Sequence, residues 1–219
     1  MDEELRAAIA ETKQRLREAI GLRRSVRDAD EAAAADEART RLVAEFLGPR
    51  LHSELTAACY LSRPGEPGTL AIIALLQAAG ARVLLPAFDA APPPIDTTGG
   101  RRGGAPGRLP NPRWAWYAGP DELTTGPHGI LQPSTPALSP PILGRAEVII
   151  CPGLAGTPAG ERLGTGGGWY DRALPWADPA AATVLLLNED EVLDSLPTEP
   201  TDERIDVIIT EERAIATRG

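Results

Sequence analysis

The chain has almost no lysine: of its 22 basic residues, only Lys13 is not an arginine. Aromatic residues are also scarce, at 4%, and there are only two cysteines. The low cysteine count excludes a small disulfide-stapled scaffold. No apolar run reaches the roughly 18 residues that a membrane span requires. A net charge of −9 argues against nucleic acid or an anionic membrane as the main partner, so we expect neither.

The two cysteines and the first residues bear on the compartment. Cys59 and Cys151 each lie in an apolar run of strand length, which favours buried free thiols. The segment Met1-Asp2-Glu3-Glu4 is acidic and does not resemble the start of a signal peptide. We therefore expect a cytoplasmic protein, and we expect it to be a monomer.

The most informative segment is rich in glycine. It runs Arg162-Leu163-Gly164-Thr165-Gly166-Gly167-Gly168-Trp169-Tyr170-Asp171. Glycines let the backbone approach a ligand closely, and consecutive N–H groups in such a turn form a concave anion site. Arg162 adds positive charge for a phosphate, and the Asp171 carboxylate suits Mg²⁺. The alternative, a plain glycine-rich surface loop, does not explain the charged and aromatic residues around the glycines.

This segment, together with Cys151-Pro152-Gly153-Leu154-Ala155 and Gly160 before it, resembles the signature of 5-formyltetrahydrofolate cyclo-ligases, also called methenyltetrahydrofolate synthetases. The resemblance extends from about residue 10 to residue 212. It implies conversion of 5-formyltetrahydrofolate to 5,10-methenyltetrahydrofolate, with ATP as co-substrate, Mg²⁺ as cofactor, and release of ADP and phosphate. It thus implies an ATP-dependent ligase that closes a carbon–nitrogen ring.

The resemblance also implies roles for particular residues. The family carries a lysine and an arginine, four residues apart, that are directed at the ATP phosphates, and Lys13 and Arg17 match them. Arginine is a poor substitute where a compact ammonium must fit among phosphates, which favours this role for the only lysine. The alternative is a pair of cations on a solvated helix face. The implied catalytic residues are Lys13, Arg17 and Arg162. ATP would be bound by these three residues together with Leu163, Gly164, Thr165, Gly166, Gly167, Gly168, Trp169 and Tyr170. The folate would be bound by Leu61, Glu66, Trp169 and Tyr170, and the metal would be held by Asp171 and Asp202.

Some of these assignments have a structural alternative. Glu66 also fits the first turn of an ordinary helix, and Trp169 and Tyr170 also fit a hydrophobic core.

The chain departs from the family pattern at three places. Gly156-Thr157 stands where an apolar residue and an aspartate are usual, Gln132 replaces a glutamate, and Thr201 replaces a histidine. These departures leave open a family member that binds folate or nucleotide but has lost turnover. A different ATP-dependent ligation of a related small acid is a further alternative.

The apolar periodicity predicts one α/β domain over residues 1–219, with three α/β/α layers around a largely parallel, Rossmann-like sheet. Helices are expected at 3–24, with Leu5 at the start of its apolar stripe, at 30–50 and at 67–79. Strands are expected at 55–61, 82–85, 114–117, 147–151, 183–187 and 205–210. Residues 86–113 contain seven prolines and five glycines, so we expect an excursion from the sheet edge there. Arg101, Arg102 and Arg108 within it could contact an anionic folate tail, but we favour the interpretation that they belong to a solvated loop.

Overall fold

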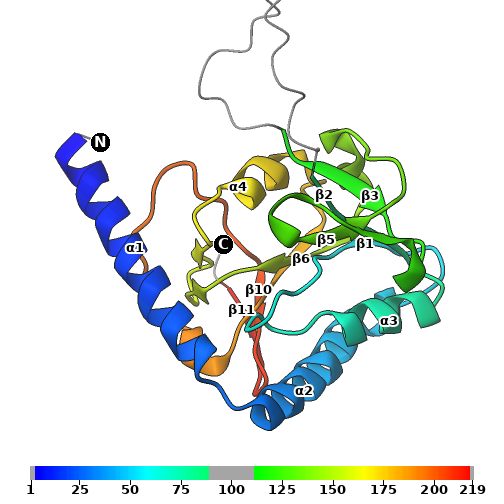
Figure 1. The fold of residues 1–219 in the computed structure, drawn as a ribbon, viewed down its shortest axis with the longest axis horizontal. Helices are drawn as coiled ribbons and strands as arrows, with labels where there is room; N and C mark the ends of the chain where they lie inside the picture. Colours follow the sequence, from blue (N-terminus) through cyan, green and yellow to red (C-terminus); the bar gives the residue numbers. More distant parts are fainter. Residues whose placement is uncertain (1–2, 89–110, 218–219) are drawn as a thin grey trace, which may run out of the picture.

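The computed structural model of the protein describes residues 3–88 and 111–217, and a seven-stranded sheet forms its centre (Figure 1). The spatial order of the strands is β11-β10-β9-β6-β1-β2-β3. Their bounds are β1 Thr56–Ala58, β2 Arg82–Ala87, β3 Arg113–Trp116, β6 Val148–Pro152, β9 Ala182–Leu186, β10 Val207–Ile209 and β11 Ala214–Ala216. The five inner strands pair in parallel, and only the edge strands β3 and β11 are antiparallel. The predicted fold class is confirmed.

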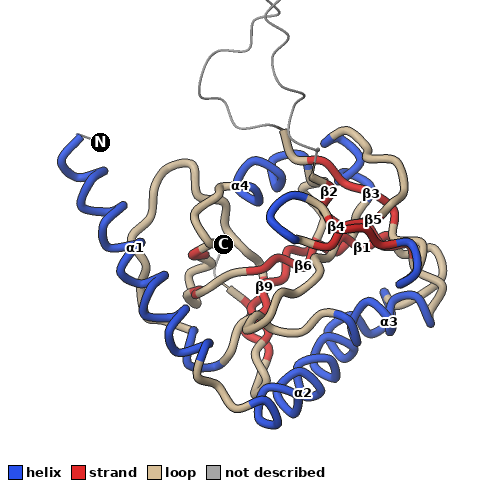
Figure 2. The backbone as a smooth tube through the Cα atoms, viewed as in Figure 1, coloured by secondary structure: helices blue, strands red, loops and turns tan. Residues whose placement is uncertain are grey.

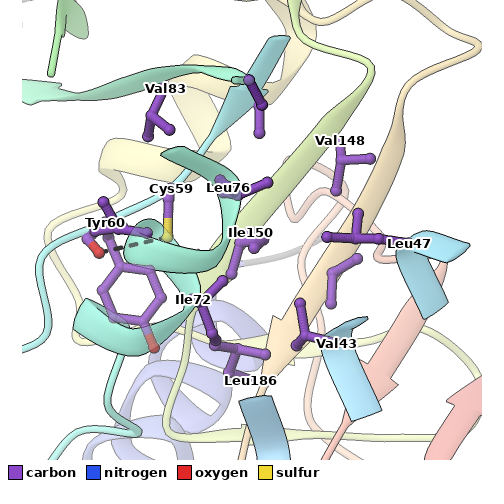
Figure 3. Close-up of a cluster of buried hydrophobic side chains, with 14 of the residues drawn as sticks. Val43, Leu47, Cys59, Tyr60, Ile72, Leu76, Val83, Val148, Ile150 and Leu186 are labelled. Atoms are coloured by element: carbon purple, nitrogen blue, oxygen red, sulfur yellow. Dashed lines mark hydrogen bonds between the residues drawn. The ribbon is translucent and has the colours of Figure 1, made fainter. Parts of the chain in front are cut away.

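Helices cover both faces of this sheet. The helices α2 (Ala29–Leu47) and α3 (Leu70–Ala78) lie on one side, and α4 (Trp169–Ala173), with short 3₁₀ helices, lies on the other (Figure 2). Under α2 and α3, Val43 and Ile72 pack against strand residues such as Val148 and Leu186 (Figure 3). Because side chains alternate along a strand, neighbouring residues of the same strands supply the second core, under α4.

The two cysteines belong to these two different cores. Cys59 faces α3, whereas Cys151 faces α4, and both are fully buried free thiols, as expected. Burial raises the pKa of each thiol to about 12. Both groups are therefore neutral at physiological pH.

Helix α1 (Glu3–Ser25) stands beside the sheet, and its N-terminal end projects from the body (Figure 1). Its C-terminal half packs through Ile20 on a hairpin of two short strands, β7 (Ala155–Gly156) and β8 (Arg162–Leu163). Near the end of the helix, the buried Arg24 side chain donates two hydrogen bonds to the Glu191 carboxylate, from Nε to Oε1 and from Nη2 to Oε2, each at 2.7 Å. The predicted apolar stripe was wrong at its start, because Leu5 is half exposed. No helix within the described ranges is long and apolar enough to cross a bilayer.

Several predicted boundaries move. The helix predicted at 30–50 ends at Leu47 and continues as a 3₁₀ turn over Gly48–Arg50. The helix predicted at 67–79 begins only at Leu70, because the Thr69 hydroxyl ties the preceding loop by donating to the Tyr60 carbonyl at 2.6 Å.

The ends of the predicted excursion belong to strands. Residues 86–87 complete β2, and Arg113 begins β3. Most of the predicted excursion, with Arg101, Arg102 and Arg108, lies outside the described residues. Five short strands were not predicted: the β7–β8 hairpin, strand β11, and a hairpin of β4 (Leu123–Thr125) and β5 (Leu131–Pro133).

Candidate active site

A pocket of about 310 Å³ opens beyond the carboxyl ends of β1, β2 and β6. This edge is where open α/β sheets bind ligands. Its walls are mainly aromatic and apolar, and we call it the aromatic pocket; they include Tyr60, Leu61, Pro86, Phe88, Ile130, Leu131, Trp169 and Tyr170. Leu61 and Glu66, both predicted to bind folate, line this pocket.

A cluster of four aromatic rings lies at one side of the aromatic pocket, and three of them, Phe88, Trp169 and Tyr170, line it. Trp169 lies at the centre, with ring centroids 4.9 Å from both Trp114 and Tyr170 and 6.2 Å from Phe88. Trp114 is fully buried, whereas Trp169 is only partly buried and borders the pocket. Trp169 therefore packs against core rings and also borders the pocket, so its contact with the folate stays a prediction.

Tyr170 contributes a neutral hydroxyl to this wall. Its side chain is buried, and burial raises its pKa well above the usual value of a phenol. Its hydroxyl has no hydrogen-bond partner among the described residues.

The glycine loop (residues 164–168) connects β8 to α4 and borders the aromatic pocket through Thr165 and Gly167. Gly166 and Gly168 have φ values of +102° and +58°, which side chains rarely adopt. The Arg172 side chain stabilises the loop by donating hydrogen bonds to the carbonyls of Gly167 at 3.1 Å and Gly168 at 2.7 Å. Thr165, Gly166 and Gly167 are exposed, so a ligand can reach the middle of the loop.

Arg162 and Asp171 flank the glycine loop and form an ion pair, with the Arg162 Nη2 atom 2.6 Å from the Asp171 Oδ1 atom. The guanidinium is 4% exposed and lies 5.7 Å from the centre of the Tyr170 ring. Its Nε atom is buried and has no partner among the described residues. The structure thus brings the two residues together, with the cation buried and the carboxylate partly open to solvent.

The two predicted cations of α1 have different surroundings. Arg17 reaches the glycine loop, where its Nε donates to the Gly164 carbonyl at 2.9 Å. Lys13 is buried, and its ammonium contacts Glu199 at 3.1 Å and Asp202 at 2.7 Å. Lys13 therefore lies next to one of the two predicted metal ligands and is not a solvated cation.

The predicted metal ligands do not form a complete protein site. Among the described residues, no group of three or more His, Cys, Asp or Glu side chains could hold a metal ion. The Asp171 carboxylate forms an ion pair with Arg162, and the Asp202 carboxylate forms one with Lys13. A metal at this site would depend on further ligands from a bound nucleotide.

Sequence reasoning missed a contact that fixes Phe88, one of the residues lining the aromatic pocket. The Phe88 backbone N–H donates to the Gln132 Oε1 atom at 2.6 Å, across 44 residues of sequence. From the sequence, Gln132 is only a departure from a family pattern, and Phe88 lies near the start of the proline-rich stretch. An amide supplies this acceptor as well as a carboxylate does.

An aromatic and apolar pocket with a few polar groups at the carboxyl edge of a parallel sheet is typical of a ligand site in an α/β protein. The model of the 5-formyltetrahydrofolate cyclo-ligase family matches residues 9–211. The chain therefore belongs to the 5-formyltetrahydrofolate cyclo-ligase family, and the resemblance predicted from the sequence is confirmed.

Individual relatives agree with this assignment. A 5-formyltetrahydrofolate cyclo-ligase from Mycolicibacterium smegmatis is 35% identical over 73% of this chain and 75% of its own length. The enzyme of that name from Escherichia coli K12 is 28% identical over 86% of this chain and 93% of its own. A 5,10-methenyltetrahydrofolate synthetase structure from Aquifex aeolicus superposes with a TM-score of 0.72 at 22% identity, covering 94% of this chain and 93% of that one. One from Mycoplasma pneumoniae gives 0.65 at 19% identity, covering 91% and 98%.

Proposed function

We propose that this chain catalyses the ATP-dependent conversion of 5-formyltetrahydrofolate to 5,10-methenyltetrahydrofolate, with release of ADP and phosphate. The observation that carries the proposal is the position of the aromatic pocket directly beside the glycine loop, whose Thr165 and Gly167 line the pocket. A reduced pterin ring needs an apolar, aromatic surface, whereas a triphosphate needs backbone N–H groups. Here the two surfaces adjoin.

The proposed chemistry begins with activation of the formyl oxygen. That oxygen attacks the γ-phosphorus of ATP, the bond from the γ-phosphorus to the bridging oxygen breaks, and ADP leaves. The formyl carbon is now bonded to a phosphate, which is a good leaving group. N10 of the folate then attacks this carbon, the carbon–oxygen bond breaks, and the N10 proton is lost. The imidazoline ring closes, and phosphate carries away the former formyl oxygen.

The protein contributes mainly position and charge to such a transfer. Arg162 would offset negative charge on the transferred phosphoryl group, and backbone N–H groups of the glycine loop would bind its oxygens. Arg17 already lies against this loop at Gly164, so its guanidinium needs little movement to reach a phosphate. Lys13 would join them after exchanging one carboxylate contact for a phosphate oxygen. Trp169 would stack on the pterin.

Mg²⁺ fits this site only as a partner of the nucleotide. Mg²⁺ in nucleotide sites is usually held by one or two carboxylates plus substrate phosphates, and it neutralises their charge. Asp171 is 28% exposed on its side chain and stands at the end of the glycine loop, so we propose it as the first ligand and Asp202 as the second.

Two of the departures from the family pattern have structural explanations. A Cβ at Gly156 would lie 2.7 Å from a methyl of Leu185, so no side chain fits there without repacking. The Thr157 hydroxyl beside it donates to the Glu161 carboxylate at 3.0 Å. Gln132 keeps its acceptor role toward Phe88. Nothing in the structure explains Thr201.

We further propose a cytoplasmic monomer. The support for the cytoplasmic location is the pair of free, fully buried thiols, which need no oxidising compartment.

The proposal is tested by incubating the protein with 5-formyltetrahydrofolate, ATP and Mg²⁺ while recording methenyl absorbance and ADP. We expect the two products in equal amounts, and Trp169→Ala should raise the KM for the folate about tenfold by removing the stacking surface. Folate binding without any methenyl product would instead identify a binding protein that has lost turnover.

A further inference from the structure

The loop after β1 contains a tight turn, Arg63-Pro64-Gly65-Glu66, that joins an arginine to the predicted folate ligand. The Glu66 N–H donates to the Arg63 carbonyl at 2.9 Å, which closes the turn. Pro64 restricts φ at the second position, and Gly65 has φ +84° at the third, as a type II turn requires. The turn therefore brings the first and fourth side chains together by its own geometry.

The Glu66 carboxylate is held on both oxygens by Arg63. Its Oε1 atom accepts from Arg63 Nε at 3.1 Å and from Nη2 at 2.6 Å. Its Oε2 atom accepts from the Arg63 backbone N–H at 2.9 Å. An ionised carboxylate has about four acceptor sites, two on each oxygen. Oε1 is thus filled, whereas Oε2 keeps one site for another donor.

Both residues border the aromatic pocket, but they differ in exposure. The Glu66 side chain is 11% exposed, whereas that of Arg63 is 49% exposed. An ion pair with so exposed a partner contributes little to folding stability. Its physical effect is to fix the orientation of a nearly buried carboxylate at the pocket wall.

We infer that Arg63 is a positioning residue for substrate recognition: it holds Glu66 so that Oε2 can accept from an N–H donor of the pterin ring. The inference rests on the proposed function, which places that ring in the aromatic pocket. Reduced pterins carry several N–H donors on one edge, and a carboxylate with a fixed orientation loses less entropy when it binds one.

The test is a double-mutant cycle of Arg63→Ala, Glu66→Gln and the double variant. We expect each single change to raise the KM for 5-formyltetrahydrofolate about tenfold, while kcat and the KM for ATP stay within about twofold. The double variant should be no worse than Glu66→Gln, because Arg63 acts only through that carboxylate. Arg63→Lys, which keeps a charged donor without the fork, should give an intermediate KM.

The matched control is Arg15→Ala, which removes another exposed ion pair, Arg15 with Glu11 on α1, and should change neither constant. The same cycle is read as the Kd for the folate without ATP, by tryptophan fluorescence, so its result does not depend on turnover. An unchanged folate KM and Kd in Arg63→Ala would overturn the inference. So would a double variant that is weaker than Glu66→Gln by the full Arg63→Ala factor, since Arg63 would then contact the substrate itself. Failure to form methenyl product with an intact coupling between Arg63 and Glu66 would contradict the proposed function alone.

Discussion

Replacing Lys13 by methionine should destabilise the protein, because it leaves two carboxylates without their shared cation. The lysine side chain is 8% exposed, whereas those of Glu199 and Asp202 are 36% and 21% exposed. Removing one partner of a fully buried ion pair costs about 3–5 kcal/mol, but these carboxylates are partly hydrated, so we expect about 2 kcal/mol. For a chain of this size, that lowers the melting temperature by about 4–8 °C.

Lys13→Arg separates this structural role from the proposed catalytic one. Arginine keeps the positive charge, so the melting temperature should fall by less than in Lys13→Met. Its planar guanidinium is larger than an ammonium and cannot occupy the same place among phosphates. We expect kcat/KM to fall by the equivalent of about 2–4 kcal/mol, which is roughly 30- to 1,000-fold.

The assay pairs thermal unfolding by circular dichroism with turnover recorded as methenyl absorbance. The control is Arg15→Met, because Arg15 is an exposed cation on the same helix and should change neither quantity. A Lys13→Met variant with the same melting temperature as the unmodified protein would refute the ion-pair reasoning. Full turnover in Lys13→Arg would refute the phosphate role.

Three further predictions address the rest of the site and the core. Asp171→Asn should raise the Mg²⁺ midpoint of turnover at least about tenfold, with folate binding in the absence of nucleotide nearly unchanged; an unchanged midpoint would leave Asp202 as the candidate ligand. Gln132→Glu should keep the KM for the folate, because a carboxylate still accepts from the Phe88 N–H, whereas Gln132→Leu should raise it several-fold; equal KM values would disprove the positioning role of this contact. The free energy of unfolding should fall as the pH rises from 9 toward 12, because thiols ionise near pH 9 in the unfolded chain, whereas burial raises the pKa of Cys59 and Cys151 to about 12. Their contribution is complete below pH 9; urea titrations at pH 8 and pH 10.5 measure the loss, which a Cys59→Ala, Cys151→Ala variant should reduce.

The sheet was predictable because its strands are continuous apolar runs bounded by glycine and proline. Residues 148–151 and 184–186 are buried on both faces, and such continuous apolar runs are typical of parallel strands. The β7–β8 hairpin has two residues in each strand, which is too short for any periodic signal. The prediction for the start of α1 was wrong for a different reason: apolar periodicity marks one face of a helix but does not show how far along the helix that face is buried, and Leu5 is half exposed.

The glycine loop was predictable because its chemistry is local. Backbone freedom, a flanking cation and a carboxylate all occur within ten residues. Contacts between distant segments were not predictable in the same way. Lys13 meets Asp202 across 189 residues, and Gln132 meets Phe88 across 44, so no spacing rule connects them. Only the fold shows that a predicted phosphate ligand and a predicted metal ligand hold each other.

The most direct test of the proposed chemistry follows the formyl oxygen. The substrate is 5-formyltetrahydrofolate labelled with ¹⁸O in the formyl group, turned over with unlabelled ATP in unlabelled water. The proposed phosphorylation transfers that oxygen to phosphorus, so mass spectrometry should find one ¹⁸O atom in each inorganic phosphate released. Unlabelled phosphate, with the ¹⁸O recovered in water, would contradict the account, because ATP hydrolysis and ring closure would then be separate events.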